Sequence, residues 1–339
     1  MGKVKLKDIA DTLHISTVTV SNALSGKKGV SEELRELVFK TARELGYDLK
    51  KYEKAKEGIR IGVIVSDKYL EVGASFYWAL YQQVAYAASK SRNLTMFEIL
   101  YAREEESGTI PQMIQERNVA GLLIIGWVKR SYVEKLVQVS GVPIVLLDFA
   151  LSGIPCDAVL SSNYIGMYKV TRYLLERGHR EITFVGSVQD NDNILDRYYG
   201  YCKALLEKGI VPRGNRRLED RDLATGEVQV EFPEDMPTAF ACNSDLAAAR
   251  LYDVLKAHGY EVPKDVSIAA YDDYLFGHPF AEQLTTYHVD MKQMAEKAVK
   301  LLQGKINGKE KRFGICYVDS VIIERDSVRT LQTQTEKKN

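Results

Sequence analysis

One short stretch near the amino terminus carries side chains suited to reading the edges of DNA bases. If residues 16–25 form a helix, three apolar residues share one face: Val20, Ala23 and Leu24. The opposite face carries small or neutral side chains, namely Thr17, Val18, Ser21, Asn22 and Ser25. In a major groove an amide can pair with adenine, methyl groups can meet thymine, and hydroxyls can hold phosphates. The pattern therefore predicts a DNA-reading helix, and a solvent-exposed helical hairpin is the alternative.

The charge distribution agrees with this interpretation. The whole chain has no formal net charge, but residues 1–58 hold twelve basic and nine acidic residues. An excess of this size is weak evidence by itself, because surface helices are commonly rich in lysine. The short turn before residue 16 and the position at the start of the chain add to it, since both are typical of a helix-turn-helix.

A second set of residues could bind a small molecule, because most of its members follow predicted strands. In open parallel sheets ligands bind beyond the carboxyl ends of the strands. Carboxylates, an amide and a guanidinium suit vicinal hydroxyls, and aromatic faces suit a sugar ring. We expect the site to contain Asp67, Tyr69, Phe76, Trp78, Asp148, Arg197, Asn243, Tyr271, Asp272 and Phe276. Structural roles remain open: Asp148 could cap a helix, Arg197 could pair with Asp272, and Tyr271 could belong to the core.

No enzyme motif, metal site or cofactor site is expected. The chain has neither a Gly-x-Ser-x-Gly elbow nor a phosphate-binding glycine-rich loop, and its five histidines lack metal-ligand spacing. The four cysteines are scattered, which is typical of reduced thiols in the cytosol. The longest apolar runs, such as residues 120–125, are too short to span a bilayer. Residues 1–8 show no export signal. We therefore expect a cytoplasmic protein without a membrane partner.

Three short helices are predicted before residue 48. The first has its apolar stripe at Leu6, Ile9, Ala10 and Leu13, and Ser16 can cap the second. Ser31 can cap the third, and Gly46 can end it. Its predicted stripe consists of Leu34, Leu37, Val38, Ala42 and Leu45. We assign residues 1–47 to a DNA-binding domain, 48–58 to a lysine-rich linker, and 331–339 to a disordered tail.

Strands and helices alternate through the rest of the chain, which indicates parallel sheets covered on both faces. Strands are expected at 59–65, 94–100, 121–125, 142–147, 181–185, 238–241 and 266–270, with a last extended segment at 314–325. Helices are expected at 75–90, 110–117, 163–177, 194–208, 244–258 and 291–303. The rhythm restarts at residue 163, so we expect two lobes within residues 59–330. The first takes about 59–161 and 291–318, and the second about 162–290 and 319–330.

The amino-terminal segment resembles the headpiece of the lactose/galactose repressor (LacI/GalR) family. The match runs through Thr19-Val20-Ser21, Val30-Ser31 to Arg35, and Glu44 to Tyr47. Further matches follow at Ile61 to Ile64, Pro143 to Asp148, Gly178-His179, Arg197, Asn243 to Asp245, and Tyr271 to Asp273. The resemblance implies a multidomain fold, with an all-α helix-turn-helix headpiece and an α/β core like a periplasmic binding protein, built from two Rossmann-like lobes.

The resemblance also implies site residues. For DNA we expect Leu6, Ser16, Thr17, Val18, Thr19, Ser21, Asn22, Ser25, Val30, Ser31, Lys50 and Lys51. For the effector the positions most often used in the family fall on Phe76, Asp148, Arg197, Asn243 and Asp272.

Two departures from the family pattern stand out. His14 stands where a glycine is usual in the turn. The linker has Leu49, Lys50, Glu53 and Lys56 where the family has a hinge helix with a wedging leucine. Its lysines could hold phosphates instead, and Leu49 or Tyr52 could replace the wedge.

These observations predict a transcription regulator, most simply a repressor, whose affinity for DNA responds to a small molecule. We expect a homodimer on a near-palindromic operator and a sugar as effector. A purine or nucleoside effector, a sugar-binding protein without DNA function, and an enzyme are the alternatives.

Overall fold

The computed structural model describes residues 4–25, 29–49, 58–70, 75–212, 216–223, 225–309 and 312–331. The chain divides into two compact units, of which the first comprises residues 1–60 with 89–94 and the second comprises 61–88 with 95–339. The linker lysines from Lys50 onward and the tail after residue 331 lie outside the described residues.

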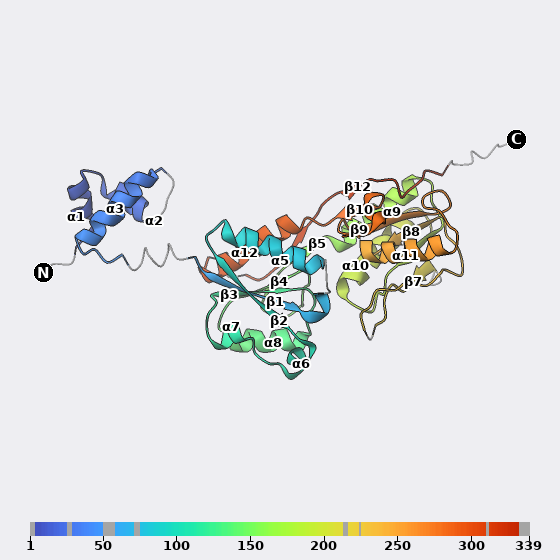
Figure 1. Ribbon diagram of the computed structural model, residues 1–339, viewed down its shortest axis with the longest axis horizontal. Helices are drawn as coiled ribbons and strands as arrows, with labels where there is room; N and C mark the ends of the chain where they lie inside the picture. Colours follow the sequence, from blue (N-terminus) through green and yellow to red (C-terminus); the bar gives the residue numbers. More distant parts are fainter. Residues whose placement is uncertain are drawn as a thin grey trace. The chain divides into compact units, whose positions relative to one another are not determined.

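Within the described residues 4–25 and 29–49, the chain forms three helices, as predicted (Figure 1). They are α1 (Leu6–Leu13), α2 (Thr17–Ser25) and α3 (Glu32–Glu44). Their shared core contains Ile9, Val20, Leu24 and Val38, all of which are buried. His14 adopts the left-handed conformation, with φ 54° and ψ 39°, and its backbone N–H closes the end of α1. A non-glycine residue in this conformation costs about 1 kcal/mol, which three packed helices can offset.

The predicted apolar stripe of α3 is corrected at two positions. Leu37 is 47% exposed and Leu45 is 37% exposed, whereas Phe39 is buried beside Val38. Consecutive helical residues are rotated by about 100°, so Leu37 points about 150° away from the direction midway between Val38 and Phe39 and falls outside the face that they bury. Leu49, assigned to the linker from the sequence, is 5% exposed and packs into the core of this unit. It is therefore not free to act as a wedge in this conformation.

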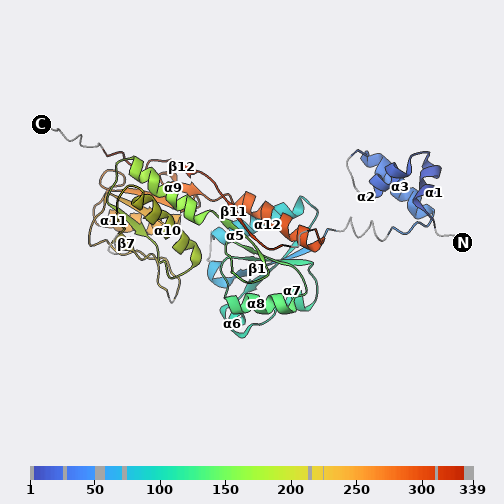
Figure 2. The same ribbon diagram turned by 180° about the vertical axis from the view of Figure 1, so that it is seen from behind.

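The second unit contains two six-stranded sheets, which confirms the two-lobed α/β fold. The first sheet has the order β11-β5-β4-β3-β1-β2, and every pairing from β11 to β1 is parallel. Its strands are β1 (Arg60–Ser66), β2 (Leu94–Leu100), β3 (Gly121–Ile125), β4 (Ile144–Leu147), β5 (Asp157–Ser161) and β11 (Ile315–Val318). Helices α5 (Phe76–Ser89) and α12 (Met291–Ile306) cover one face. Helices α7 (Gln112–Gln115) and α8 (Arg130–Val139) cover the other (Figures 1 and 2).

The second sheet has the order β12-β10-β9-β8-β6-β7 and is parallel except for the β10–β12 pair. Its strands are β6 (Ile182–Val185), β7 (Arg217–Leu218), β8 (Ala239–Cys242), β9 (Ser267–Asp272), β10 (Thr285–His288) and β12 (Ile322–Ile323). Helices α9 (Asn163–Glu176), α10 (Asp192–Leu206) and α11 (Asp245–Ala257) pack around it. Short 3-10 helices lie at Asp67–Tyr69 and Pro279–Glu282.

Several predicted elements need correction. The helix expected at 110–117 contracts to the single turn of α7, and the last extended segment divides into β11 and β12. Those two strands belong to different sheets, so the chain must break its extended course between them. Helices α6 (Ala102–Ser107) and α8, and strands β5, β7 and β10, were not predicted. Helix α6 has the sequence AREEES, which offers no apolar stripe to detect.

Candidate DNA interface and effector site

The exposed face of α2 is arranged as the sequence predicts. Val20, Ala23 and Leu24 are buried, whereas Thr17 and Ser25 are exposed. Val18 is 65% exposed, which is unusual for a large apolar side chain on a well-packed unit. Ser21 and Asn22 are half-buried on the same helix. A surface that combines a methyl-bearing residue with an amide and hydroxyls has the chemistry needed for base edges.

Serine hydroxyls fix the ends of the two neighbouring helices. The Ser16 Oγ accepts a hydrogen bond from the Thr19 backbone N–H at 2.9 Å and lies 2.8 Å from the Thr19 Oγ1. Ser31 caps α3 by accepting from the Leu34 backbone N–H at 3.3 Å. Caps of this kind satisfy backbone donors that the first helical turn leaves free. Ser16 and Ser31 therefore position the helices, whether or not they also touch DNA.

Two residues predicted to contact DNA lie against the core of the amino-terminal unit. Leu6 and Val30 are half-buried and pack against the buried cluster. Arg35, by contrast, was not singled out for a structural role. Its Nη1 donates to the Ala23 carbonyl oxygen at 3.3 Å, near the end of α2 where backbone acceptors are free. Arg35 thus ties α3 to the carboxyl end of α2. Lys50 and Lys51 lie outside the described residues.

Asp148 is the most unusual polar residue of the predicted effector site. It follows β4 with φ 68°, a left-handed conformation that few non-glycine residues adopt. Its side chain is 3% exposed, and its Oδ2 accepts from the Tyr77 hydroxyl at 3.1 Å. Burial raises the pKa of Asp148 to about 6, against the opposing effects of Arg197 and the Tyr77 hydrogen bond. The other carboxylate oxygen, Oδ1, is buried without a hydrogen-bond partner among the described residues.

Arg197 lies close to Asp148 but is held within the second lobe. Its Nε donates to the Asn163 Oδ1 at 2.8 Å, and its Nη1 donates to the Asn243 carbonyl oxygen at 2.6 Å. The guanidinium carbon stands 3.9 Å from the centre of the Tyr271 ring. Asp272 is its charge partner, with 3.6 Å between Nη1 and Oδ1. Arg197 therefore links α9, α10 and the ends of β8 and β9.

Asp272 ends β9 at φ 123°, which is a strained conformation for a non-glycine residue. Burial raises the pKa of its carboxyl group, and the charge of Asp148 raises it further, while Arg197 acts in the opposite direction. Tyr271 is fully buried beneath these groups, and its hydroxyl bonds to Ser161. Two carboxylates and one guanidinium thus meet where the lobes approach each other.

Asn243 has a structural role that the sequence did not reveal. Its Nδ2 donates to the Val185 carbonyl oxygen at 3.0 Å and to the Asp220 Oδ2 at 2.6 Å. Arg221 also binds Asp220, at 2.9 Å, and reaches Asp190 at 3.0 Å. Burial alone would raise the pKa of Asp220, but its bonds to Arg221 and Asn243 hold that pKa below the ordinary value. The Asn243 amide nitrogen is consequently committed to its own lobe.

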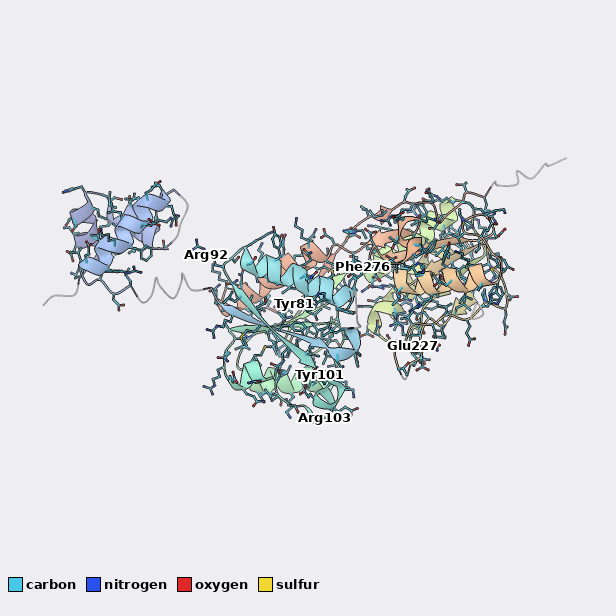
Figure 3. All side chains as sticks on the ribbon, in the orientation of Figure 1. Tyr81, Arg92, Tyr101, Arg103, Glu227 and Phe276 are labelled. Atoms are coloured by element: carbon cyan, nitrogen blue, oxygen red, sulfur yellow. The ribbon has the colours of Figure 1, made fainter. Side chains whose placement is uncertain are left out.

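The remaining predicted residues divide into two groups. Tyr69 and Phe76 lie near Asp148, because both contact Tyr77, with ring centres 4.5 and 5.3 Å away. The other three predicted residues are exposed or have contacts away from Asp148. Trp78 packs on Tyr81 and Phe97, Phe276 is 76% exposed (labelled in Figure 3), and Asp67 accepts from the next backbone N–H.

Sequence reasoning missed Tyr77 and Asn193. The Asn193 Nδ2, on α10, donates to the Asp148 carbonyl oxygen at 2.8 Å and so joins the second lobe to the first. The only available signals were their positions, since Tyr77 is next to Phe76 and Asn193 is one helical turn before Arg197.

Among the described residues, no group of three or more His, Cys, Asp or Glu side chains could hold a metal ion. Within the same residues, no helix is long and apolar enough to cross a membrane.

Comparison with known proteins decides the family. Residues 5–48 match the bacterial regulatory proteins of the lacI family, and residues 171–328 match the periplasmic binding protein-like domain. The chain belongs to the LacI family. It is therefore a DNA-binding transcription regulator with an effector-binding domain, and the expectation drawn from its headpiece and core motifs is confirmed.

Relatives and solved structures cover nearly the whole chain. The HTH-type transcriptional repressor PurR of Vibrio atlanticus is 26% identical over 335 residues, which are 96% of this chain and 99% of the relative. The ribose operon repressor of Haemophilus influenzae is 25% identical over 96% of this chain and 99% of its own length. Among solved structures, the complex of the transcriptional regulator CelR with cellobiose has a TM-score of 0.68 at 22% identity, covering 96% of this chain and 100% of its own. The lac repressor dimer bound to operator has a TM-score of 0.66 at 19% identity, covering 97% and 100%.

Proposed function

We propose that this LacI-family regulator is a repressor that binds a near-palindromic operator as a homodimer through α2. The observation that carries the proposal is the exposed face of α2, where Val18 is 65% exposed beside Thr17 and Asn22 on an otherwise well-packed unit. Ser21 and Ser25 complete this face, and Lys50 and Lys51 of the linker are proposed to hold phosphates. A single headpiece covers too few base pairs for useful selectivity, so two copies are needed.

The proposed effector is a sugar bound between the lobes. Asp148 presents a buried carboxylate and Asp272 a half-buried one, both of which favour hydroxyl donors, and Arg197 is the charge partner of Asp272. Relatives and structural neighbours of the chain include a ribose operon repressor and a regulator in complex with cellobiose. A purine or nucleoside is the second candidate, because Phe76 could stack on a base. Calorimetric titration with sugars and with purines separates the two.

The proposal places the protein in the cytoplasm, where its DNA target lies, and assigns it no enzymatic activity. Support comes from its membership of a family of transcription regulators.

Substitution of Asn22 tests the DNA interface. Asn22→Ala should weaken binding to DNA selected from a random pool by about 1 to 3 kcal/mol and relax the preference at one base position, because a bidentate amide contact is lost. Fluorescence anisotropy with the selected site and with single-base variants of it measures both effects.

Thr12→Ala serves as the matched control, because Thr12 is exposed on α1 and its hydroxyl bonds to the Asp8 carbonyl oxygen of its own helix. It should leave affinity and sequence preference as in the wild type. If Asn22→Ala lowered the affinity for selected and random DNA equally, Asn22 would be a general contact and the assignment of base reading to it would be wrong.

A further inference from the structure

Tyr77 contacts Asp148 in the proposed effector site. It lies in the first turn of α5, and its hydroxyl donates to the Asp148 Oδ2 at 3.1 Å. Burial raises the pKa of the Tyr77 hydroxyl well above its ordinary value, and the charge of Asp148 adds to this, so the hydroxyl stays protonated as a donor. Tyr77 therefore offers Asp148 the kind of group that a sugar would offer.

The hydrogen bonds of the Asp148 carboxylate are unevenly distributed. The hydroxyl of Tyr77 and the Asn193 Nδ2, at 3.4 Å, both approach Oδ2. Oδ1 is buried and has no partner among the described residues. A carboxylate can accept several hydrogen bonds, and a buried acceptor without a partner is costly. The Asp148 Oδ2 thus accepts hydrogen bonds from the protein, and its Oδ1 can accept one from a ligand.

The ring of Tyr77 also takes up space at this position. It lies beside Tyr69, with ring centres 4.5 Å apart and planes inclined by 42°. Gly126, at φ 78°, makes room for both rings, since a Cβ atom there would lie 2.8 Å from the Tyr69 ring and 3.1 Å from that of Tyr77. The end of β3 is therefore shaped to admit these two tyrosines, and the ring of Tyr77 occupies volume beside the Asp148 carboxylate.

We propose that Tyr77 determines the specificity of the effector site. Its hydroxyl takes the place of one ligand hydroxyl at Oδ2, and its ring limits the ligand to a small molecule that donates one hydrogen bond to Oδ1. The ligand class is then a monosaccharide or a smaller polyol, and a disaccharide is excluded. This inference rests on the proposed function, in which the site between the lobes binds the effector.

Shortening the side chain tests the limit on size. Tyr77→Ala should bind cellobiose at least about tenfold more tightly than the wild type does, because the ring no longer fills the space. Isothermal titration calorimetry with cellobiose and with D-ribose gives the two affinities. Tyr81→Ala is the matched control, since Tyr81 lies on the same helix (labelled in Figure 3) but packs against Trp78 and Phe97.

Two results would overturn the limit on size. One is the absence of any gain in cellobiose binding by a folded Tyr77→Ala protein. The other is an equal gain in Tyr81→Ala, which would show general loosening of the lobe.

Removing only the hydroxyl tests the role of Oδ2 and keeps the ring for folding. In Tyr77→Phe both oxygens of Asp148 can accept from a ligand, so a vicinal diol gains a second bond. The preference for D-ribose over 2-deoxy-D-ribose should therefore grow about threefold or more relative to the wild type, in keeping with one added hydrogen bond. An unchanged preference, or loss of both sugars by Tyr77→Phe when the wild type binds D-ribose, would refute the proposal that the Tyr77 hydroxyl replaces a ligand hydroxyl at Oδ2.

The same measurements separate this inference from the proposed function. If Tyr77→Ala gains the ability to bind cellobiose while the wild type binds no sugar, Tyr77 limits the size of ligand that the site accepts, but the natural effector is not a sugar. If the wild type binds D-ribose and no substitution of Tyr77 alters selectivity, the sugar effector stands and the inference about Tyr77 fails. Operator binding without ligand is measured separately for each protein, because the headpiece contains neither residue.

Discussion

At the scale of single residues, burial alters the acidity of Asp148. Its pKa in the folded protein is about 6, compared with an ordinary value of 3.8. The folded state therefore binds this proton more tightly than the unfolded state does. Stability consequently falls as the pH rises from near the ordinary value to about 6, and it changes no further from this cause at higher pH.

This shift gives a prediction for Asp148→Asn, which keeps the shape of the side chain but cannot ionise. The free energy of unfolding of the variant minus that of the wild type should be about 1 kcal/mol more positive at about pH 7 than at about pH 5. The wild type alone loses stability over this range, and one pKa unit corresponds to about 1.36 kcal/mol. Urea denaturation at the two pH values measures this difference. The opposite sign, with the variant gaining more at the lower pH, would contradict a raised pKa.

The site residues that lie at the ends of strands could be predicted from the sequence. Asp148 directly follows a strongly apolar predicted strand and Asp272 lies two residues after another, so their place at the edge of a sheet could be inferred from the sequence. Positions on a helix are harder, because neighbours point about 100° apart. Of three consecutive aromatic residues on α5, Phe76 and Trp78 were chosen, yet Tyr77 is the one that reaches Asp148. Only the tertiary contact distinguishes them.

At the scale of elements, α5 and β2 present a surface suited to a second copy of the chain. Trp78, Gln82 and Tyr86 are exposed and lie one above another at intervals of four residues on α5. Trp78 also packs on Phe97 of β2, the outermost strand of its sheet. Exposed aromatic residues next to an unpaired strand edge are typical of an interface.

Charge introduced on this surface should therefore dissociate the proposed dimer. The double variant Trp78→Asp, Tyr86→Asp is expected to sediment as a monomer at micromolar concentration, because burying an unpaired carboxylate in an interface is costly. Phe313→Asp is the matched control: Phe313 is 52% exposed, comparable with Trp78 at 42% and Tyr86 at 57%, but it precedes β11 at the other edge of the sheet. A dimer that survives the double variant, or one lost in the control, would locate the interface elsewhere.

The elements themselves were predicted where their patterns were strong. Strand β3 and helix α12 carry long apolar runs or stripes and were found, with α12 extending three residues further than expected. Strands β7 and β12 have two residues each, too few to show any period. Strand β10 has the sequence TTYH, and its burial comes from neighbours on both sides in the sheet. Tertiary pairing creates such strands, so a local pattern cannot reveal them.

At the scale of the whole molecule, we expect effector and operator to influence each other through a change in the arrangement of the lobes. Several hydrogen bonds cross between the lobes near the site. The Asn193 Nδ2 donates to the Asp148 carbonyl oxygen and, at 3.4 Å, to the Asp148 Oδ2. The Tyr271 hydroxyl bonds to the Ser161 hydroxyl, and the Tyr274 hydroxyl donates to the Ser75 carbonyl oxygen at 3.4 Å. A ligand that contacts both lobes can shift the equilibrium between two arrangements of the lobes only if it binds one arrangement more tightly than the other. Asn193 contributes to the difference in free energy between the two arrangements, because its bond to Asp148 exists only while the lobes are close.

The last prediction concerns this coupling. Typical coupling of about 1 to 3 kcal/mol changes operator affinity by about 5 to 150 fold, and linkage requires the operator to change effector affinity by the same factor. In Asn193→Ala this factor should fall, and it should fall equally in both directions, because one contact that distinguishes the arrangements is gone. Titrating operator with and without effector, and effector with and without operator, gives both factors. Asn307→Ala is the control, since the Asn307 amide bonds to the Gln303 carbonyl oxygen at the end of α12. If Asn193→Ala retained the wild-type factor, the Asn193–Asp148 bond would be incidental, and the coupling would have to pass through the other contacts between the lobes or through the segments that join them.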